Sequence, residues 1–258
     1  MLLITDLQEI PSLNDPCGLT IGSFDGVHLG HQALLQHLRS KLPSCGKLAV
    51  FTFSNHPTHL FTPERPVPLI CPPLQKVKHL ADCGVDLVFL IPFTREFSKT
   101  PFREFLSYLK ARLNFFYLTL GMGASFGKDK EGIETNVRKL ATELHFTVDY
   151  LPKTVVGKDP VSSGRVRTAI TQADFHQVQH CLGRPYSLMG RPAQQSNLFQ
   201  LSLPGICLPP EGIYPVRMKI HDTFHLGRAS VLPKQHTIRL DPLHTSISLY
   251  NKDIEVIF

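Results

Sequence analysis

The sequence predicts an α/β fold that is followed by a small all-β domain. Two observations lead to this prediction: apolar runs alternate with helical patterns up to about residue 185, and short extended runs with many prolines follow. Alternating strands and helices form parallel βαβ units, whose sheet is covered by helices on both faces. We therefore expect a parallel sheet between two helical layers in the first part of the chain.

The elements of this first part can be placed one after another. Short apolar runs bounded by turn residues predict buried strands at 19–24, 48–53, 85–91, 116–120 and 146–151. Apolar residues at helical spacing predict helices at 30–42, 74–83, 102–113 and 136–144. Each helix lies between two strands, which is the chain order of a parallel sheet.

The pattern changes after about residue 185, where no long helical pattern continues. Extended runs predict strands at 213–220, 236–240, 247–250 and 254–258, with a hairpin turn at 251–253. We therefore predict two domains, residues 1–185 and residues 186–258, the second of which is a small barrel or sandwich.

Composition limits the class of protein. The net charge of +6 suits polyanionic ligands such as nucleotides. The basic residues are scattered, so we expect small-molecule partners, with no nucleic acid and no membrane. No apolar run reaches 18 residues, and the N-terminus lacks the pattern of a secretory signal, so we expect a cytoplasmic protein. None of the six cysteines forms a Cys-x-x-Cys pair, which argues against a zinc ribbon.

A histidine pair occupies the junction between strand 19–24 and helix 30–42, within Gly22–His31 (GSFDGVHLGH). This junction lies at the carboxyl end of a strand, where ligands of parallel sheets bind, and the helix start favours phosphate. Gly26 and Gly30 let the backbone approach a ligand closely. His28 and His31, three residues apart, share a helical face and can donate hydrogen bonds to phosphate oxygens. Such donors stabilise attack at phosphorus without a covalent nucleophile.

Two other interpretations of the pair stay open. A tight turn with incidental histidines is one, because the chain has 13 histidines and His56 and His59 form a similar pair beside Pro57, which we take as turn residues. Zinc is the other, but it needs three or four ligands and no cysteine or carboxylate is suitably spaced. The strand before the pair and the helix after it favour phosphate.

A second candidate phosphate site lies at 161–167 (VSSGRVR). Ser162 and Ser163 can cap the helix that follows and can bind an anion through hydroxyl and backbone N–H groups. Arg167 offers two donors for a bidentate phosphate contact. A plain helix cap with solvated arginines explains the pattern equally well.

Five segments of the chain, in order, are similar to one protein family. They are 22–31, 53–57 (FSNHP), 92–97 (PFTREF), Ser162–Ser163 with Arg165 and Arg167, and 182–186 (LGRPY). The chain resembles the prokaryotic bifunctional riboflavin kinase/FMN adenylyltransferases, the bacterial FAD synthetases. This likeness spans residues 18–190. A fainter likeness to the family's kinase domain rests on 208–214 (LPPEGIY) and 249–256 (LYNKDIEV).

The resemblance implies a Rossmann-like nucleotidylyl-transferase domain, a six-stranded β-barrel domain, and AMP transfer from ATP to FMN with Mg²⁺. It implies that the substrates are ATP and FMN, with riboflavin added if the kinase is active. His28 and His31 would contact the ATP phosphates, and Gly22, Phe24 and Gly30 would approach the nucleotide. Ser162, Ser163 and Arg167 would hold the triphosphate. Phe126 would form a flavin wall, or else a core contact, and Phe61 is a weaker flavin candidate for which we favour a core role. The metal ligands are unknown.

Several positions depart from the family pattern. Gly164 replaces a usual Thr, and Gly123 with Ala124 replaces an Asp or Asn followed by Phe. The kinase signature Pro-Thr-Ala-Asn corresponds here to 197–200 (NLFQ), whose Leu and Phe lack the oxygen ligands that Mg²⁺ needs. The kinase general-base Glu has no clear counterpart. Asp241 is a possible substitute for it, but we expect Asp241 to start a turn with Pro242 instead. We therefore expect a degenerate kinase domain with weak or lost riboflavin kinase activity.

Four alternatives remain at this point: a fully bifunctional enzyme, a nucleotidylyl-transferase with another acceptor such as pantetheine phosphate, a non-catalytic flavin or nucleotide carrier, and a nucleic-acid-binding role permitted by the basic charge. The matches beyond the histidine motif argue against a different acceptor. The substitutions at Gly123, Ala124 and Gly164 motivate the carrier.

Overall fold

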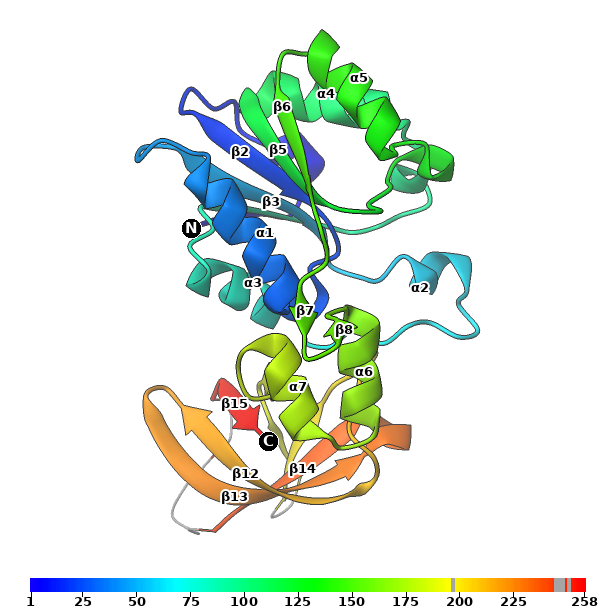
Figure 1. Cartoon of the computed structure of the whole chain (residues 1–258). Coiled ribbons are helices and arrows are strands. Elements are labelled where there is room, and N and C mark those ends of the chain that lie inside the picture. The colour runs from blue at the N-terminus through cyan, green and yellow to red at the C-terminus, as the bar shows by residue number, and fades with distance from the viewer. Residues whose placement is uncertain (196–197, 244–248, 250–251) are drawn as a thin grey trace. The chain divides into compact units, whose positions relative to one another are not determined.

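The computed structural model describes residues 1–195, 198–243, 249 and 252–258. The chain forms two compact units, one from residues 1–66 and 77–160 and the other from residues 67–76 and 161–258. Figure 1 labels their elements. The predicted fold class, α/β followed by a small all-β part, is confirmed. These compact units do not share the bounds of the predicted domains, and the functional division at 185/186 stays a prediction.

A six-stranded sheet, parallel throughout, forms the centre of the first unit, with the strand order β1-β4-β3-β2-β5-β6. The strands are β1 Leu2–Ile4, β2 Cys17–Ile21, β3 Lys47–Phe53, β4 Leu87–Ile91, β5 Phe115–Gly121 and β6 Thr147–Leu151. All five residues of β2 and of β4 are buried. Burial on both faces explains why these strands read as continuous apolar runs.

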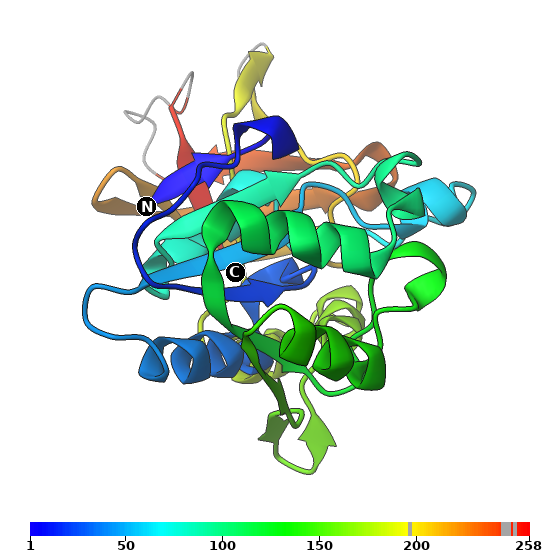
Figure 2. The ribbon, with the colours of Figure 1, turned by 90° about the horizontal axis from the view of Figure 1, so that it is seen from above.

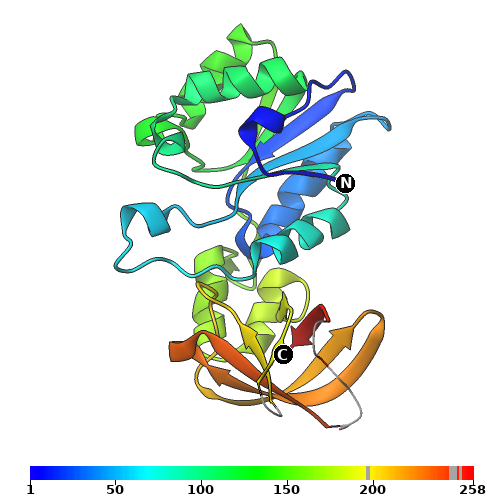
Figure 3. The same cartoon turned by 180° about the vertical axis from the view of Figure 1, so that it is seen from behind.

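Helices cover both faces of this sheet, as Figures 1 and 3 show. Apolar residues of α1 Leu29–Ser40 and α3 Pro73–Asp82 enter one core cluster, and those of α4 Phe102–Leu113 and α5 Glu134–Glu143 enter the other. The helical spacing seen in the sequence is therefore the spacing of the buried face of each helix. A short helix, α2 Thr58–Phe61, follows β3, and the hairpin of β7 Val155–Val156 and β8 Asp159–Pro160 projects from the unit in Figure 2.

The second unit contains a seven-stranded sheet of order β10-β11-β14-β13-β12-β15-β9, in which all pairs are antiparallel. Its strands are β9 Ser187–Gly190, β10 Ala193–Gln195, β11 Leu198–Ser202, β12 Gly212–Ile220, β13 Thr223–Leu232, β14 Thr237–Pro242 and β15 Ile254–Ile257. Two helices, α6 Ser163–Thr171 and α7 Phe175–Leu182, precede them. The resemblance implied six strands, whereas the described residues form seven.

The segment 67–76 belongs to the second unit because polar groups tie it there. The hydroxyl of Tyr186 donates to the carbonyl oxygens of Ile70 and Cys207, at 3.3 and 2.6 Å. The Gln75 amide donates to the carbonyl oxygen of Ser187 at 2.9 Å. The ring of Tyr186 is buried, so these bonds satisfy a polar tip inside an apolar environment.

The turn predicted at Asp241 is absent from the structure. Asp241 does not start a turn: it is an internal residue of β14 and pairs with Arg228 of β13. The strand and turn predicted at 247–253 fall largely outside the described residues, as does Asn197 of the kinase-signature stretch.

Candidate active site

The histidine junction lies at the point where the strand order reverses. Successive strands β2, β3 and β4 run to one side of the sheet, and the chain then returns to place β5 on the other side of β2. The carboxyl end of β2 is therefore a topological switch point, which is where open parallel sheets bind ligands. The sequence predicted a strand end, and the structure shows that it is the central one.

His28 and His31 are brought together as predicted. Their rings stack with centroids 3.6 Å apart, and the ring of Phe24 lies 4.8 Å from that of His31. His28 is the N-cap of α1, and its Nδ1 accepts a hydrogen bond from the His31 backbone N–H at 3.3 Å. An accepting Nδ1 leaves the proton of a neutral imidazole on Nε2, so that atom can donate to a phosphate oxygen.

The chain enters α1 through an unusual backbone. Phe24 and Val27 have φ values of +48° and +41°, and Gly26 between them has +76°. A β-branched residue with positive φ is a rare and strained state that surrounding structure must hold in place. Here the Gln32 amide donates to the carbonyl oxygen of Val27 at 2.9 Å, and the Thr52 hydroxyl donates to that of Ser23 at 2.8 Å.

Two glycines leave room for the rings of the site. A Cβ at Gly30 would lie 3.2 Å from the His28 imidazole, and a Cβ at Gly22 would lie 3.2 Å from the Phe24 ring. Both contacts are tighter than ordinary packing. Gly22 and Gly30 therefore allow the aromatic rings to close over the strand end, in addition to allowing the close approach of a ligand.

A cavity of about 820 Å³ lies in the same unit and reaches the end of β2 at Ile21. Both flavin candidates line this cavity. Phe126 is half-buried and packs on the core. Phe61 is 63% exposed, and its one ring contact among those described is with Phe93. The core role that we favoured for Phe61 is therefore wrong. His56 also lines the cavity, and His59 lies in α2 rather than in a turn.

The sequence analysis missed much of this cavity. Its walls include Phe53, Phe93 and Phe97. Lys99, Lys128 and Lys130 make its rim basic, although Asp129 also lies there. A backbone bond from Lys128 N–H to the Thr100 carbonyl oxygen, 2.9 Å long, brings the two rim loops together. Runs 92–97 and 53–57 were visible as motifs, but only the fold shows that their rings face one space.

The second phosphate segment belongs to the other compact unit. Ser162 is the N-cap of α6, because its hydroxyl accepts from the Arg165 backbone N–H at 3.2 Å, and Ser163 is the first residue of that helix. Arg167 Nε donates to the carbonyl oxygen of Pro68 at 2.7 Å. The predicted helix cap is confirmed, while a shared triphosphate site with His28 stays a prediction.

The departures from the family pattern have a local explanation at one position. Gly123 has a φ of +80°, a conformation that glycine and asparagine adopt readily, and a Cβ there would touch nothing within 4 Å. Gly164 is exposed in the first turn of α6. Nothing in the structure explains why a threonine is absent there.

The described residues contain neither a clustered metal site nor a membrane-spanning helix. No three His, Cys, Asp or Glu side chains in this part of the chain gather so as to hold a metal ion. No helix of the described ranges is long and apolar enough to cross a membrane.

The chain is similar to one protein family and to several known proteins. Residues 10–165 match the FAD synthetase family. The chain is 30% identical over 224 residues to a bifunctional riboflavin kinase/FMN adenylyltransferase of Listeria monocytogenes, covering 83% of this chain and 71% of that protein. A protein of the same name from Escherichia coli is 28% identical over 98% of this chain and 86% of its own length. A solved structure titled macrolide-efflux protein, from Streptococcus pneumoniae, has a TM-score of 0.82 at 24% identity over 99% of this chain and 88% of that one, which shows a shared fold.

Proposed function

We propose that this chain, which belongs to the FAD synthetase family, transfers the AMP group of ATP to FMN and makes FAD and pyrophosphate. The observation that carries the proposal is the stacked His28–His31 pair at the helix start over the central strand end, beside an aromatic cavity. A phosphate-binding end and a flavin-sized space in one unit are what this reaction needs.

In the proposed reaction an oxygen of the FMN phosphate attacks the α-phosphorus of ATP. A new P–O bond forms to FMN, the bond from the α-phosphorus to the bridging oxygen breaks, and its electron pair leaves with pyrophosphate. Negative charge grows on the phosphate oxygens, and Nε2–H of His28, the His31 ring and the N-terminal N–H groups of α1 stabilise it. No covalent intermediate on the protein is involved.

The nucleotide would lie along the glycine-lined strand end, against the backbone of Gly22, Phe24 and Gly30. Ser162, Ser163 and Arg167 would bind triphosphate oxygens at the start of α6. The support for this part is the confirmed serine cap at α6, whose N-terminal N–H groups and hydroxyls can bind an anion.

FMN would occupy the cavity with Phe126 and Phe61 against the isoalloxazine ring. A volume of about 820 Å³ lies within the range of small-molecule pockets. Lys128 and Lys130 of the rim would attract the FMN phosphate, and Lys99 adds to the same positive field.

Mg²⁺ is proposed to arrive with the ATP phosphates. Magnesium keeps several waters and is held by few carboxylates plus substrate phosphates, so a dedicated protein cage is not required. The described residues offer no three-ligand cluster, and we assign no step to a metal held by the protein alone.

Riboflavin kinase activity is proposed to be weak or lost. Residues 198–200 of the stretch equivalent to the family's Thr and Asn ligands lie in β11, where Phe199 stands next to Gln200. Asp241 is exposed within β14. The two relatives described above are named as bifunctional, so a fully bifunctional enzyme is the alternative. A cytoplasmic location, with no nucleic-acid or membrane partner, completes the proposal.

One coupled assay tests both activities. Purified protein with Mg-ATP receives FMN in one reaction and riboflavin in another, and FMN and FAD are separated by chromatography. We expect FAD from FMN and little FMN from riboflavin. No FAD from FMN would refute the transferase, and binding without pyrophosphate release would favour a non-catalytic carrier.

The histidine pair can be tested with matched variants. His28→Asn and His31→Gln should each lower kcat on the order of 10²-fold to 10³-fold, because each removes a donor to the transition state. His176→Gln, an exposed histidine of α7, serves as the control and should leave kcat unchanged.

A further inference from the structure

Helix α1 carries the proposed catalytic histidines at one end and is seated closely on β2. Leu35 and Leu38 of α1 are buried against the sheet. Gly18 of β2 makes this seat possible, because a Cβ there would meet Leu38 Cδ1 and Leu42 Cδ2, each at 2.7 Å. Apolar packing sets how far the helix lies from the sheet, and directional hydrogen bonds from its polar side chains add a restraint on its rotation about its own axis.

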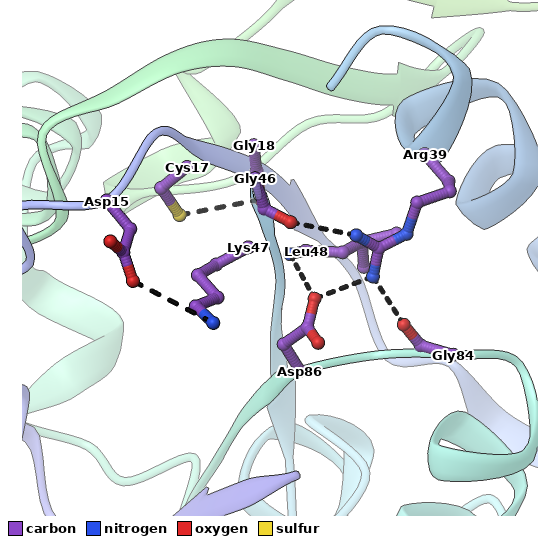
Figure 4. Close-up of polar contacts among 9 residues, drawn as sticks. All are labelled: Asp15, Cys17, Gly18, Arg39, Gly46, Lys47, Leu48, Gly84 and Asp86. Carbon is purple, nitrogen blue, oxygen red and sulfur yellow. Dashed lines mark hydrogen bonds and ion pairs between the residues drawn. The ribbon is translucent and has the colours of Figure 1, made fainter. Parts of the chain in front are cut away.

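A first polar tether ties the last turn of α1 to the starts of β3 and β4 (Figure 4). Arg39 donates through Nη1 to the carbonyl oxygen of Gly46 at 2.9 Å, and through Nη2 to Asp86 Oδ2 at 2.6 Å and to the carbonyl oxygen of Gly84 at 2.5 Å. Asp86 also accepts from the Leu48 backbone N–H at 2.8 Å. A planar guanidinium held at three points has a fixed orientation, which a single ion pair would lack.

The carboxyl group in this tether is held ionised. Partial burial alone would raise the pKa of Asp86, but hydrogen bonds from the Leu48 amide and the Arg39 guanidinium lower it overall. The nearby ion pair of Lys47 with Asp15 is longer, at 3.8 Å, and does not involve α1.

A second tether leaves α1 on its opposite flank. His37 Nε2 and Asp149 Oδ2 of β6 lie 2.7 Å apart, and the Tyr117 hydroxyl of β5 donates to the same oxygen at 2.6 Å. The hydrogen bond from Tyr117, opposed by partial burial and aided by His37, lowers the pKa of Asp149. His37 and Arg39 are two residues apart, or about 200° around a helix of 3.6 residues per turn.

The sheet order makes the two tethers oppose each other. β3 and β4 lie on one side of β2, and β5 and β6 lie on the other. Arg39 therefore restrains α1 toward the first side, and His37 restrains it toward the second. Two restraints on opposite flanks of a helix together fix its rotation about its axis.

We propose that Arg39 and His37 are positioning residues that set the direction of the His28 and His31 rings by fixing this rotation. The proposal rests on the proposed function. A ring tip about 6 Å from the axis moves about 1 Å for each 10° of rotation, for a helix of this geometry. A misplacement of about 1 Å in a catalytic group can cost about 10²-fold in rate. Neither residue lies in the histidine turn, so each would act through the helix.

A role in stability alone makes a different prediction. Exposed and half-exposed ion pairs contribute little to folding, and their loss would lower the melting temperature slightly without changing the reaction. Arg103 and Glu143 supply the control, because they form a doubly hydrogen-bonded pair between α4 and α5, outside the helix in question. Arg103→Met removes a pair of the same chemistry and should leave kcat unchanged.

The experiment measures kcat, KM for ATP, KM for FMN and the melting temperature of the full chain. We expect Arg39→Met and His37→Leu each to lower kcat about 5-fold, and the double variant to lower it at least 100-fold, because residues that restrain one element act non-additively. KM for FMN should not change, since no residue of α1 lines the cavity. Arg39→Lys keeps the charge but not the fork, so its kcat should lie between wild type and Arg39→Met.

A second readout follows the rings directly. In protein labelled with ¹⁵N-histidine, the imidazole resonances of His28 and His31 should shift in Arg39→Met and His37→Leu but not in Arg103→Met. If Arg39→Met does not fold, Arg39→Lys and His37→Leu carry the test. Unchanged kcat and unchanged ring resonances, or losses equal to those of Arg103→Met, would overturn the proposal. If the wild type makes no FAD, the proposed function fails, and the ring resonances still decide whether the tethers orient the histidines.

Discussion

Substituting Gly30 by alanine adds one Cβ, which should favour the helix but displace the His28 ring and lower activity. Gly30 is the second residue of α1, and glycine in a helix is less stable than alanine by about 0.5–1 kcal/mol. The new Cβ would lie 3.2 Å from two atoms of the His28 ring, whereas carbon contacts are optimal at about 3.5–4.0 Å. The ring must therefore move by a few tenths of an ångström, on the order of the difference between these distances.

This movement of the His28 ring would weaken the cap hydrogen bond that the ring accepts, which is already long. The His28 Nδ1 to His31 N–H distance is 3.3 Å, and losing an N-cap bond costs about 0.5–2 kcal/mol. The gain in helix propensity and the loss of the cap nearly cancel, so we expect the free energy of unfolding of Gly30→Ala to change by less than about 1 kcal/mol. The rate of FAD formation should fall about 10-fold to 100-fold, because the displaced ring no longer meets the phosphate.

Denaturant unfolding and FAD formation, measured on the same preparation, decide the matter. Gly164→Ala is the matched control for stability, because Gly164 is also the second residue of a helix with a side-chain cap. The cap there is Ser162, and a Cβ at Gly164 would meet only Ser162 Oγ, at 3.8 Å. It should stabilise the chain by about 0.5–1 kcal/mol. Wild-type kcat and KM for ATP in Gly30→Ala would refute the reasoning about the His28 ring.

Three further predictions concern other groups. Phe126→Ala should raise KM for FMN about 10-fold with little change in KM for ATP, because an aromatic wall is lost; titration of FMN fluorescence checks it. The double substitution Lys128→Gln with Lys130→Gln should weaken FMN binding more than riboflavin binding, and the difference should shrink at high salt, where screening removes it; calorimetry at two ionic strengths would show this. The pKa of Asp86 is lowered in the fold, so its carboxylate stabilises the protein above the unfolded pKa of about 3.9, and this stabilisation is lost as the pH falls from there through the folded pKa. Asp86→Asn should therefore make stability depend less on pH in the acid range, which thermal melts from about pH 6 to pH 3 test.

Long periodic elements could be predicted from the sequence, because their pattern is set locally. The range 102–113 was predicted as a helix and is α4, and 48–53 was predicted as a strand and lies within β3. The same is true of the histidine turn, whose strand, glycines and helix follow one another along the chain.

Other elements could not be predicted because their stabilisation is long-range. β13 mixes exposed and buried residues, and its pairing with β12 and β14 forms the centre of the second sheet. The short strand β1 is recognisable only through its parallel partner β4. The cavity is of the same kind: Phe53 ends β3, whereas Phe93 and Phe97 follow β4, and no sequence spacing shows that the ring of Phe53 meets the other two.

Helix α1 combines a feature that adjacent residues predict with one that depends on long-range contacts. Its first turn carries the proposed catalytic histidines and can be recognised from adjacent residues, whereas its last turn carries Arg39 and His37, which resemble ordinary solvent-facing residues of an amphipathic helix. Their partners Asp86 and Asp149 lie 47 and 112 residues away in sequence. On this proposal, the histidine motif can be complete and its rings still point in the wrong direction if these distant tethers are changed. The partners of Arg39 lie at the starts of β3 and β4, at the end of the sheet opposite the histidines, and the partners of His37 are internal residues of β5 and β6, so neither tether belongs to the histidine motif or to the cavity.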